Sequence, residues 1–352
     1  MRTLVVGAAG KLGAYIATAL GRLPEFEIHL GVRDPLVAPK LRSAVSRLCD
    51  RDIETHIIDA NAPDAGFLSR LSPQLIIDCA GPFQMRSGLL ARAAMLRQAH
   101  LIDVADARGH ISAIETLKSE AHEAGVLAVS GAALSPGVTG ALISEIAPRF
   151  SAVQAIDVAI AEAAGGRFGD GYRASVLLGL NVPVPTVSGG RPVTVRAGRS
   201  PTSRRFVSNR RLFANADLAE LMTAPTEFGQ LASLATRRAF PTDAEARALS
   251  LLAAVRPSAV GRDPLRYINT WDDLGDRLGR LAKSRSGGVR VAVQGTMRNG
   301  QRGEVISEIH TKGEDVIGLA ASPAIAIATD LAHGRLNYRG VHRPSDLAPI
   351  SR

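Results

Sequence analysis

The sequence predicts an α/β fold in which a doubly wound parallel sheet is followed by a second α/β domain with a mostly antiparallel sheet. An apolar run, Leu4 to Val6, leads directly into the glycine-rich string GAAGKLG. Short apolar runs then alternate with helical stretches up to residue 134, which is typical of a parallel sheet. Near the end, two long alternating runs flank Asn299 and Gly300, a pair typical of an antiparallel hairpin.

The first glycine-rich turn has the pattern of a dinucleotide-binding site. Three glycines follow a strand and open a helix, so a pyrophosphate can approach the backbone amides at the helix N-terminus. The predicted cofactor contacts in this turn are Gly7, Ala9, Gly10, Lys11, Leu12 and Gly13. A purely structural glycine turn is the alternative, because small residues also serve tight connections that bind nothing.

The residue after the second strand indicates which dinucleotide binds. Arg33 follows the strand 27–32, about 20 residues beyond the glycine turn, where a Rossmann fold contacts the adenosine ribose. A planar cation there suits a 2′-phosphate, and Lys40 and Arg42 add positive potential. NADP(H) is therefore the predicted cofactor, with NAD(H) as the alternative because Asp34 lies beside Arg33.

Four more strands are predicted, at 56–60, 75–81, 101–106 and 126–134, which makes six, with helices at 87–98 and 113–123. Ligands of doubly wound sheets lie at the carboxyl ends of the strands. We therefore expect the residues at the ends of the third and fourth strands to border the cofactor. These residues are Asp59, Ala80, Gly81, Pro82 and Phe83.

Length and composition predict a cytoplasmic protein of two domains. The chain has 352 residues, of which 46% are hydrophobic, enough to form two cores. We see neither an apolar run of membrane-spanning length nor a signal-peptide layout, so we expect no membrane association. Cys49 and Cys79 form no disulfide framework and lack metal-ligand spacing, so we expect no metal site.

The net charge of +9 raises the question of nucleic-acid binding. Aromatic residues make up only 4% of the chain, which leaves few stacking platforms for bases, and the arginines are dispersed. We therefore expect no nucleic-acid partner. The dense stretch from Arg191 to Arg211 is predicted to be a solvated or mobile loop, with contact to an acidic substrate or partner as the alternative.

Several strings occur in the order and spacing of a known family. They are GAAGKLG at the start, IIDCAGPF at 76–83, LIDVADARG at 101–109, ALSPGVTG at 133–140 and the closing stretch 322–347. The chain thereby resembles the saccharopine reductase-like family of oxidoreductases, which carries the saccharopine dehydrogenase NADP-binding domain. The resemblance implies NADPH binding in the first domain, a largely antiparallel sheet in the second, and reduction of imines formed from amino acids and carbonyl compounds.

The same resemblance implies where substrate binds. Family members have an acidic residue where this chain has Ser135, in a segment that lines the active site and continues with Pro136 and Gly137, and often a second one where Thr139 stands. A hydroxyl cannot supply the negative charge that holds an iminium or ammonium group, so saccharopine itself is not expected as the substrate. Ser135 is kept as a catalytic candidate, and Pro136 and Gly137 as substrate contacts.

Reduction of a polar double bond also needs a proton donor. Asp106, at the end of the fifth strand, is the first candidate, with a capping or loop carboxylate as the alternative. His110 is the second, because its side chain titrates near neutral pH. Arg108 is placed to contact the substrate, and Asp103, inside the strand, is expected to bond to backbone or a helix end.

The domains are predicted at 1–139, 140–318 and 319–352, the last returning to the first domain through a helix at 323–332. In the second domain a linking helix at 140–147 precedes a strand at 153–163 and the glycine-rich segment GGRFGDGY. Tyr172 and Arg173 at its end are candidate contacts for a substrate carboxylate. Asp272 and Asp273, after the lone Trp271, are expected to begin a helix rather than to act as acid and base.

Together these observations predict an NADPH-dependent oxidoreductase that transfers hydride to the C=N bond of an amino-acid-derived or cyclic imine. The alternatives are an enoyl or carbonyl reductase on the same scaffold, and a non-catalytic NADP(H)-binding redox sensor. The predicted partners are a small-molecule substrate and a second copy of the chain, because the hairpin of the second domain can pair across a dimer axis.

Overall fold

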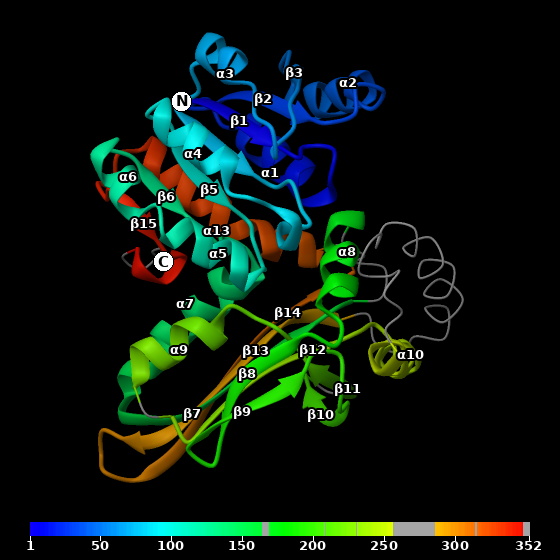
Figure 1. Cartoon of the computed structure of the whole chain (residues 1–352), viewed down its shortest axis with the longest axis vertical. Coiled ribbons are helices and arrows are strands. Elements are labelled where there is room, and N and C mark those ends of the chain that lie inside the picture. The colour runs from blue at the N-terminus through cyan, green and yellow to red at the C-terminus, as the bar shows by residue number, and fades with distance from the viewer. Residues whose placement is uncertain (164–168, 208, 230, 256–285, 314, 348–352) are drawn as a thin grey trace. The chain divides into compact units, whose positions relative to one another are not determined.

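In the computed structural model, the described residues are 1–163, 169–207, 209–229, 231–255, 286–313 and 315–347. The chain forms two compact units (Figure 1). The first, here called the Rossmann unit, comprises Met1–Ala133 and Ala320–Arg352, and the second comprises Leu134–Leu319. The expectations for Trp271 and its two aspartates, and for most of the glycine-rich segment before Tyr172, lie outside the described residues.

The Rossmann unit contains a parallel sheet of seven strands, in the order β15-β6-β5-β4-β1-β2-β3. Its strands are β1 (Arg2–Val6), β2 (Glu27–Val32), β3 (Glu54–Ile57), β4 (Leu75–Asp78), β5 (His100–Asp103), β6 (Leu127–Val129) and β15 (Gly340–His342). Its helices are α1 (Lys11–Gly21), α2 (Ala38–Cys49), α3 (Ala65–Leu71), α4 (Leu89–Leu96), α5 (Arg108–Glu115) and α6 (Lys118–Glu123). The predicted doubly wound fold is confirmed.

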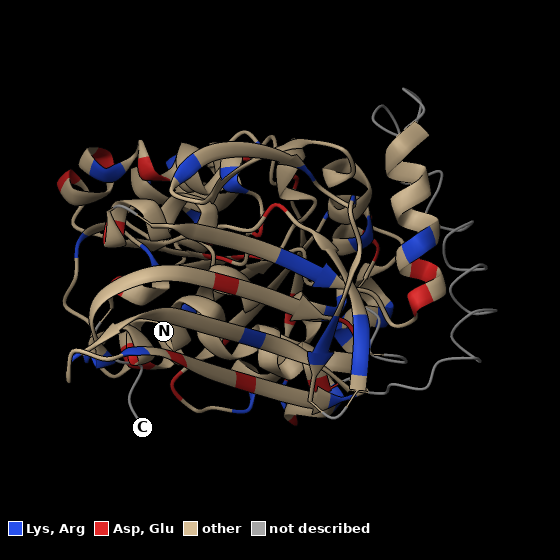
Figure 2. Ribbon diagram, turned by 90° about the horizontal axis from the view of Figure 1, so that it is seen from below, with Lys and Arg blue, Asp and Glu red and all other residues tan. Residues whose placement is uncertain are grey.

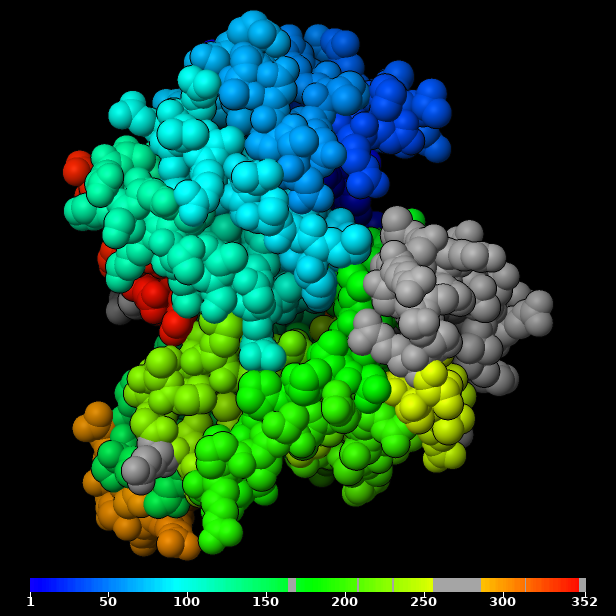
Figure 3. All heavy atoms as spheres, viewed as in Figure 1, coloured from blue at the N-terminus to red at the C-terminus, as the bar shows by residue number. Residues whose placement is uncertain are grey.

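The prediction of six strands is wrong by one. The C-terminal segment adds β15, which pairs in parallel with β6 through Gly340, Val341 and His342. Figure 3 shows this returning segment in red beside the green-cyan surface around α6, in agreement with the contacts between α6 and β15. A three-residue strand with one apolar buried side chain, Val341, has too little pattern to be recognised before its partner is known.

Two further boundaries differ from the predictions. The helix predicted over 113–123 is two helices, because Thr116 ends α5 and its hydroxyl donates to the carbonyl of Ala113 at 2.7 Å, in competition with the backbone. The third strand runs over Glu54–Ile57 rather than 56–60. Asp59 ends the predicted run early, because its carboxylate accepts the amide of Asn61 at 2.8 Å and closes a turn.

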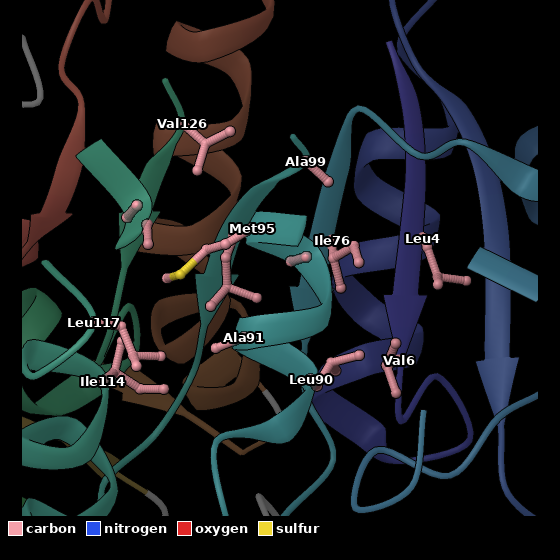
Figure 4. Packing of buried hydrophobic residues seen from close by; sticks show 14 of the residues in the cluster. Leu4, Val6, Ile76, Leu90, Ala91, Met95, Ala99, Ile114, Leu117 and Val126 are labelled. Carbon is pink, nitrogen blue, oxygen red and sulfur yellow. The ribbon is translucent and has the colours of Figure 1, made fainter. Parts of the chain in front are cut away.

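The core on one face of this sheet joins β1 and β4 to α4 (Figure 4). Leu4 and Ile76, on neighbouring strands, are fully buried, and so is Leu90 on the helix. The period-2 pattern of the strands and the helical spacing of Leu90, Ala91, Ala94 and Met95 together form one apolar layer. This layer fixes the ends of the strands, and with them the turns that carry the candidate site residues.

The second unit contains a mixed, mostly antiparallel sheet of eight strands, as predicted. The order is β10-β11-β12-β7-β13-β14, with β8 paired to β12 and β9, and among the described strands only β12 and β7 pair in parallel. The strands are β7 (Phe150–Ala161), β8 (Pro183–Ser188), β9 (Arg191–Arg196), β10 (Thr202–Phe206), β11 (Asn209–Asn215), β12 (Ser233–Ala239), β13 (Ser286–Met297) and β14 (Arg302–Lys312). The helices are α7 (Thr139–Ile146), α8 (Asp170–Gly179), α9 (Glu220–Phe228) and α10 (Asp243–Val255).

The predicted hairpin around Asn299 and Gly300 is confirmed, since β13 and β14 pair in antiparallel register and Gly300 has φ +82°. The prediction of a solvated or mobile loop over 191–211 is wrong. β9, β10 and β11 run through it, and Gly189 and Gly190, both at positive φ, turn β8 into β9. A Gly-Gly pair between alternating runs is itself a hairpin signal, which the density of arginines obscured.

The arginines of this segment are used within the second unit. Arg204 donates to Asp157 at 2.8 Å. Arg211 is 4% exposed and donates to the carbonyls of Glu162 and Phe240, each at 2.6 Å. Figure 2 shows basic and acidic positions scattered along the strands rather than gathered in one block. A carboxylate therefore satisfies Arg204, and backbone carbonyls satisfy Arg211.

The last long helix, α13 (Asp315–Ala332), begins eight residues before the predicted start at 323, because Pro323 lies inside the helix rather than at its beginning. By length and composition, α13 is the one helix among the described residues that is apolar enough to cross a membrane, and half of it is buried in the protein. Core helices pass the same test.

Candidate functional site

The turn from β1 into α1 is shaped by backbone packing. Gly7 has φ +78°, a left-handed conformation that glycine adopts without strain. A Cβ on Gly7 would lie 2.7 Å from the backbone of Cys79 and Ala80, and one on Gly13 would lie 2.5 Å from the carbonyl oxygen of Gly7. The close approach of the two strands and the helix therefore requires glycine at both positions.

Gly10, the N-cap of α1, is under a weaker constraint than Gly7 and Gly13. Its φ of −74° and ψ of 154° are open to any residue, it is exposed, and a Cβ there would meet only the carbonyl oxygen of Gly7, at 3.3 Å. Ser, Thr, Asp and Asn stabilise an N-cap because their side chains accept the amides of the first turn. Gly10 offers no such side chain, and a helix N-terminus without one is a typical place for an anion to bind.

The other predicted contacts of this turn lie beside it. Ala9 and Lys11 are exposed, and Leu12 is half-buried. These residues fit the pyrophosphate of a dinucleotide, because the turn combines a bare helix N-terminus with a glycine backbone that permits close approach.

Arg33 is exposed and follows the last residue of β2. The neighbouring Asp34 accepts the amide of Leu36 at 2.9 Å, so its carboxylate shapes the loop. Arg42, expected to add positive potential, forms a salt bridge with Asp52 at 2.9 Å. Among the described residues, Arg33 and Lys40 form no salt bridge, unlike Arg42, and Arg33 lies at the strand end itself.

A buried salt bridge organises the turn that follows β4. Arg86 binds both carboxylate oxygens of Asp78, at 2.8 and 3.2 Å, and donates to the carbonyls of Ala80 and Ala60 at 2.6 and 3.2 Å. Both side chains are 4% exposed. Burial raises the pKa of Asp78, and the guanidinium of Arg86 offsets part of that effect. Arg86 thereby ties the turn after β4 to the end of β3.

The predicted contacts in this turn differ in exposure. Gly81 is exposed and Pro82 is half-buried, whereas Phe83 is only 5% exposed and packs beneath Arg86, with the guanidinium 5.9 Å from the ring centre. Phe83 thus supports the turn from inside. The third-strand candidate Asp59 is exposed at the neighbouring strand end.

The end of β5 repeats this arrangement with a histidine. Asp103 is the register partner of Asp78 and accepts the amides of Ala105 and Gly131 at 3.0 and 2.9 Å, so the expectation that it bonds to backbone is confirmed. Its second oxygen lies 3.5 Å from Nε2 of His110. Burial alone would raise the pKa of Asp103, but hydrogen bonding and charge from His110, with the amide of Gly131, hold it below its usual value.

The two candidate proton donors therefore sit in different surroundings. His110 is 4% exposed and its ring centre lies 5.0 Å from that of Phe83. Asp106 is half-buried in the loop after β5, and Arg108, also half-buried, is the first residue of α5. Asp106 and Arg108 are the more accessible pair, whereas His110 is buried beside Asp103 and Phe83.

In the second unit, the turn that contains Ser135 is bound to a carboxyl group that the sequence reading did not identify. The Ser135 hydroxyl donates to Glu220, on α9, at 2.7 Å and accepts the amide of Ala219 at 3.3 Å. The Thr139 hydroxyl contacts the other carboxyl oxygen of Glu220. Ser135, Thr139 and Glu220 are all buried, as are Pro136 and Gly137 between them.

The hydrogen bonds of Thr139 bear on the protonation state of Glu220. Oγ1 of Thr139 lies 3.1 Å from the carbonyl of Leu134 and also contacts Glu220, yet a hydroxyl has one proton to donate. When that proton goes to Leu134, the carboxyl of Glu220 must donate the other bond. Burial raises the pKa of Glu220, although the hydroxyls of Thr139 and Ser135 counteract this, which favours the protonated form.

A second buried acid, Glu162, follows the end of β7. The hydroxyl of Tyr172 donates to it at 2.7 Å, and the guanidinium of Arg238 lies 5.1 Å from the centre of the Tyr172 ring. Burial, assisted by the charge of Glu245, raises the pKa of Glu162 to about 7, although Arg238 and Tyr172 act to lower it. Arg173, beside Tyr172, is half-buried with Asp170 at 3.9 Å.

Sequence reading missed Arg86, Glu162 and Glu220. Of these three, only Arg86 lies close in sequence to its partner, because it follows Asp78, at the end of β4, by eight residues. Glu220 lies 85 residues from Ser135, and only the fold brings them together.

No protein-family model and no curated protein sequence match the chain. Several solved structures match the chain over most of its length. Saccharopine dehydrogenase (L-Glu forming) from Saccharomyces cerevisiae aligns with 99% of this chain and 96% of its own length, with a TM-score of 0.69 and 10% identity. The chain has the fold of saccharopine dehydrogenase. The predicted resemblance is confirmed at the level of the fold.

Two other dehydrogenases share this fold over most of their length. Amine dehydrogenase from Mycobacterium smegmatis covers 100% of this chain and 97% of its own, with a TM-score of 0.53 and 9% identity. A probable dehydrogenase from Thermotoga maritima covers 95% and 89%, with a TM-score of 0.50 and 7% identity. Both units of the chain therefore have counterparts in these structures.

Proposed function

We propose that this protein is a cytoplasmic NADP(H)-dependent oxidoreductase that transfers hydride to the C=N bond of an amino-acid-derived or cyclic imine. The full-length likeness to proteins named saccharopine dehydrogenase and amine dehydrogenase supports the enzyme class and the choice of a carbon–nitrogen bond. The strings shared with saccharopine reductase-like enzymes support the same choice.

The observation that carries the proposal is the N-cap of α1. Gly10 leaves the amides of the first turn without a capping side chain, at a position whose backbone conformation is open to any residue. That loss of a cap is explained if an anion binds there. Arg33 at the end of β2 supports NADP(H) over NAD(H), because a guanidinium suits a 2′-phosphate.

Bound NADPH supplies the hydride in this proposal. The first-turn amides hold the pyrophosphate, Arg33 the 2′-phosphate, and the exposed Asp59 and Gly81 border the cofactor at neighbouring strand ends. Asp106 donates the proton that the amine product needs, with His110 as the second candidate. Arg108, Ser135, Pro136, Gly137, Tyr172 and Arg173 are kept as the predicted substrate-side residues.

The first test is the binding of NADPH and NADH, measured by calorimetric titration. Wild type should prefer NADPH, and Arg33→Ala should lose about 1–3 kcal/mol of that preference by removing a charge-assisted hydrogen bond. Arg47→Ala is the matched control, because Arg47 is an exposed arginine on α2 that the proposal does not use. Equal binding of both cofactors by wild type would remove Arg33 from its role.

Gly10 supplies the second test. Gly10→Asp places a carboxylate where the pyrophosphate would bind, so it should weaken NADPH binding far more than Gly10→Ser does. Each variant adds an N-cap side chain but also a Cβ 3.3 Å from the carbonyl oxygen of Gly7, so thermal unfolding of both variants checks that they are folded. Equal binding by all three proteins would contradict the site.

Turnover separates the chemical alternatives. NADPH oxidation should occur with members of a panel of cyclic and amino-acid-derived imines. Turnover of enoyl or carbonyl substrates alone would favour the alternative reductases, and tight NADPH binding without turnover across the panel would favour a redox sensor. The proposed homodimer, paired through β13 and β14, is tested by sedimentation equilibrium.

A further inference from the structure

A group of histidine and glutamate side chains lies on β2 and β3, apart from every residue used above. In a strand, alternate residues point to the same face, so Glu27 and His29 share a face of β2, and Glu54 and His56 share a face of β3. The parallel register places His29 opposite Glu54, so the four side chains meet on one face of the sheet.

Three of them converge on a single point. Nδ1 of His29 lies 3.0 Å from Nε2 of His56, and Oε2 of Glu54 lies 3.6 Å from each of these nitrogens. Tetrahedral zinc with bonds of about 2.0–2.1 Å has ligand-to-ligand edges of about 3.3–3.4 Å. The observed triangle is close to one face of such a tetrahedron.

The fourth side chain orients the first. Nε2 of His29 lies 3.2 Å from Oε1 of Glu27, and Nε of Arg2 donates to the same oxygen at 3.2 Å. A metal-bound histidine usually donates its other ring N–H to a carboxylate, which fixes the tautomer and directs the free lone pair at the ion. With Nε2–H donated to Glu27, Nδ1 of His29 is the nitrogen that faces His56 and Glu54.

A simple hydrogen bond between the two rings is the rival explanation. It accounts for the 3.0 Å contact between His29 and His56, but it does not require a carboxylate oxygen equidistant from both nitrogens. The surroundings also suit an ion. His29 is only 9% exposed at its side chain, Glu54 is 64% exposed, and Glu27, His29 and Glu54 line a surface pocket of about 520 Å³ through which an ion can enter.

We propose that His29, Glu54 and His56 bind a divalent transition-metal ion of the zinc class, with Glu27 as the carboxylate that orients His29 and water in the fourth position. Two nitrogens and one oxygen are a donor set that zinc accepts. The expectation of no metal site rested on cysteine spacing, and this group contains no cysteine.

The position suggests a structural role. β3 is the edge strand of the sheet, has four residues and pairs only with β2. An ion held by His29 and by two residues of β3 would cross-link the edge strand to its neighbour. Glu27 and Glu54 are the first residues of their strands and His29 is the third residue of β2, whereas Arg33 follows the carboxyl end of β2, so the metal site and the proposed cofactor site share no residue.

The experiment is a titration of untagged, metal-free protein with Zn²⁺ by calorimetry, repeated with Co²⁺ to record the d–d absorption of a tetrahedral site. Wild type should bind one ion per chain. His56→Gln should abolish stoichiometric binding, and Glu27→Gln should weaken it about 10–100-fold without changing the stoichiometry. His122→Gln, which changes an exposed histidine on α6, is the matched control and should bind as wild type does.

Thermal unfolding gives an independent readout. An ion that binds only the folded state raises the melting temperature, so Zn²⁺ should raise that of wild type and of His122→Gln but not that of His56→Gln. Circular dichroism without metal checks that His56→Gln is folded. Failure of wild type to bind one ion, or equal binding by His56→Gln and His122→Gln, would overturn the proposal.

Discussion

The two units neutralise their buried acids in different ways. In the Rossmann unit each buried aspartate at a strand end faces a basic side chain, Arg86 for Asp78 and His110 for Asp103. In the second unit, Glu162 and Glu220 are hydrogen-bonded by hydroxyl groups. These are Tyr172 for Glu162, on which the charge of Arg238 also acts, and Ser135 with Thr139 for Glu220.

The difference determines whether a buried acid in each unit keeps a fixed charge or can change its protonation state. A guanidinium keeps its proton at any physiological pH, so the Asp78–Arg86 pair is a fixed part of the turn it braces. A hydroxyl can hydrogen-bond to either form of a carboxyl group, and burial raises the pKa of Glu162 to about 7 and that of Glu220 above its usual value. The following changes test this contrast, from the largest expected effect to the smallest.

Arg86→Met should cost about 3–5 kcal/mol of unfolding free energy, because it leaves Asp78 buried without its cation. Urea denaturation measures it. Arg92→Met is the control, since Arg92 forms an exposed pair with Glu120 and should cost at most about 1 kcal/mol. Equal losses in the two variants would mean that Asp78 does not depend on Arg86 for its charge.

Glu162→Gln should change how stability depends on pH. The pKa of Glu162 is about 7 in the folded protein and near 4.5 unfolded, so between these values the native state binds the extra proton. Wild-type stability therefore falls as pH rises from about 4.5 through 7, by up to about 3 kcal/mol from this group. Glutamine mimics the protonated acid and keeps an acceptor for Tyr172.

The variant should therefore match wild type near pH 5 and exceed it near pH 9, measured by urea denaturation across the range. Glu123→Gln, an exposed glutamate on α6, should show no such divergence. Parallel pH curves for wild type and Glu162→Gln would show that Glu162 releases its proton as readily in the folded state as in the unfolded chain.

Thr139→Val should cost about 1–3 kcal/mol, because it removes a hydroxyl that satisfies both Glu220 and the carbonyl of Leu134 while it keeps the side-chain volume. The control is Thr226→Val on α9, where an exposed hydroxyl bonds only to backbone carbonyls and the loss should be smaller. A loss in Thr139→Val no larger than in the control would argue against a structural bond between the turn and α9.

Tyr172→Phe should have the smallest effect, about 1 kcal/mol at neutral pH, because the loss of one hydrogen bond to Glu162 is partly offset when the acid takes up a proton. The Tyr172 hydroxyl acts to lower the pKa of Glu162, so its removal should extend the fall in stability to higher pH. Tyr15→Phe, which alters a tyrosine that is 46% exposed, should leave the curve unchanged.

Local patterns predicted the elements whose signals lie within a few residues. The turn at Gly7 and Gly13 is confirmed because a left-handed φ and close backbone approach leave only glycine possible. The hairpin at Asn299 is confirmed because Gly300 adopts a positive φ between two antiparallel strands. The strands between Arg191 and Arg211 cannot be inferred from the density of arginines. The Gly189–Gly190 pair is the local feature that indicates their first hairpin.

By itself the sequence determined the alternation of strands and helices, the glycine turn that opens α1 and the order of the two units. Tertiary structure alone decided that Glu220 binds Ser135, that β15 completes the first sheet, and that His29 meets His56 and Glu54. The physical reason is the range of the interaction. Backbone conformation depends on adjacent residues, whereas the partner of a buried polar side chain is fixed by packing between segments that can lie anywhere along the chain.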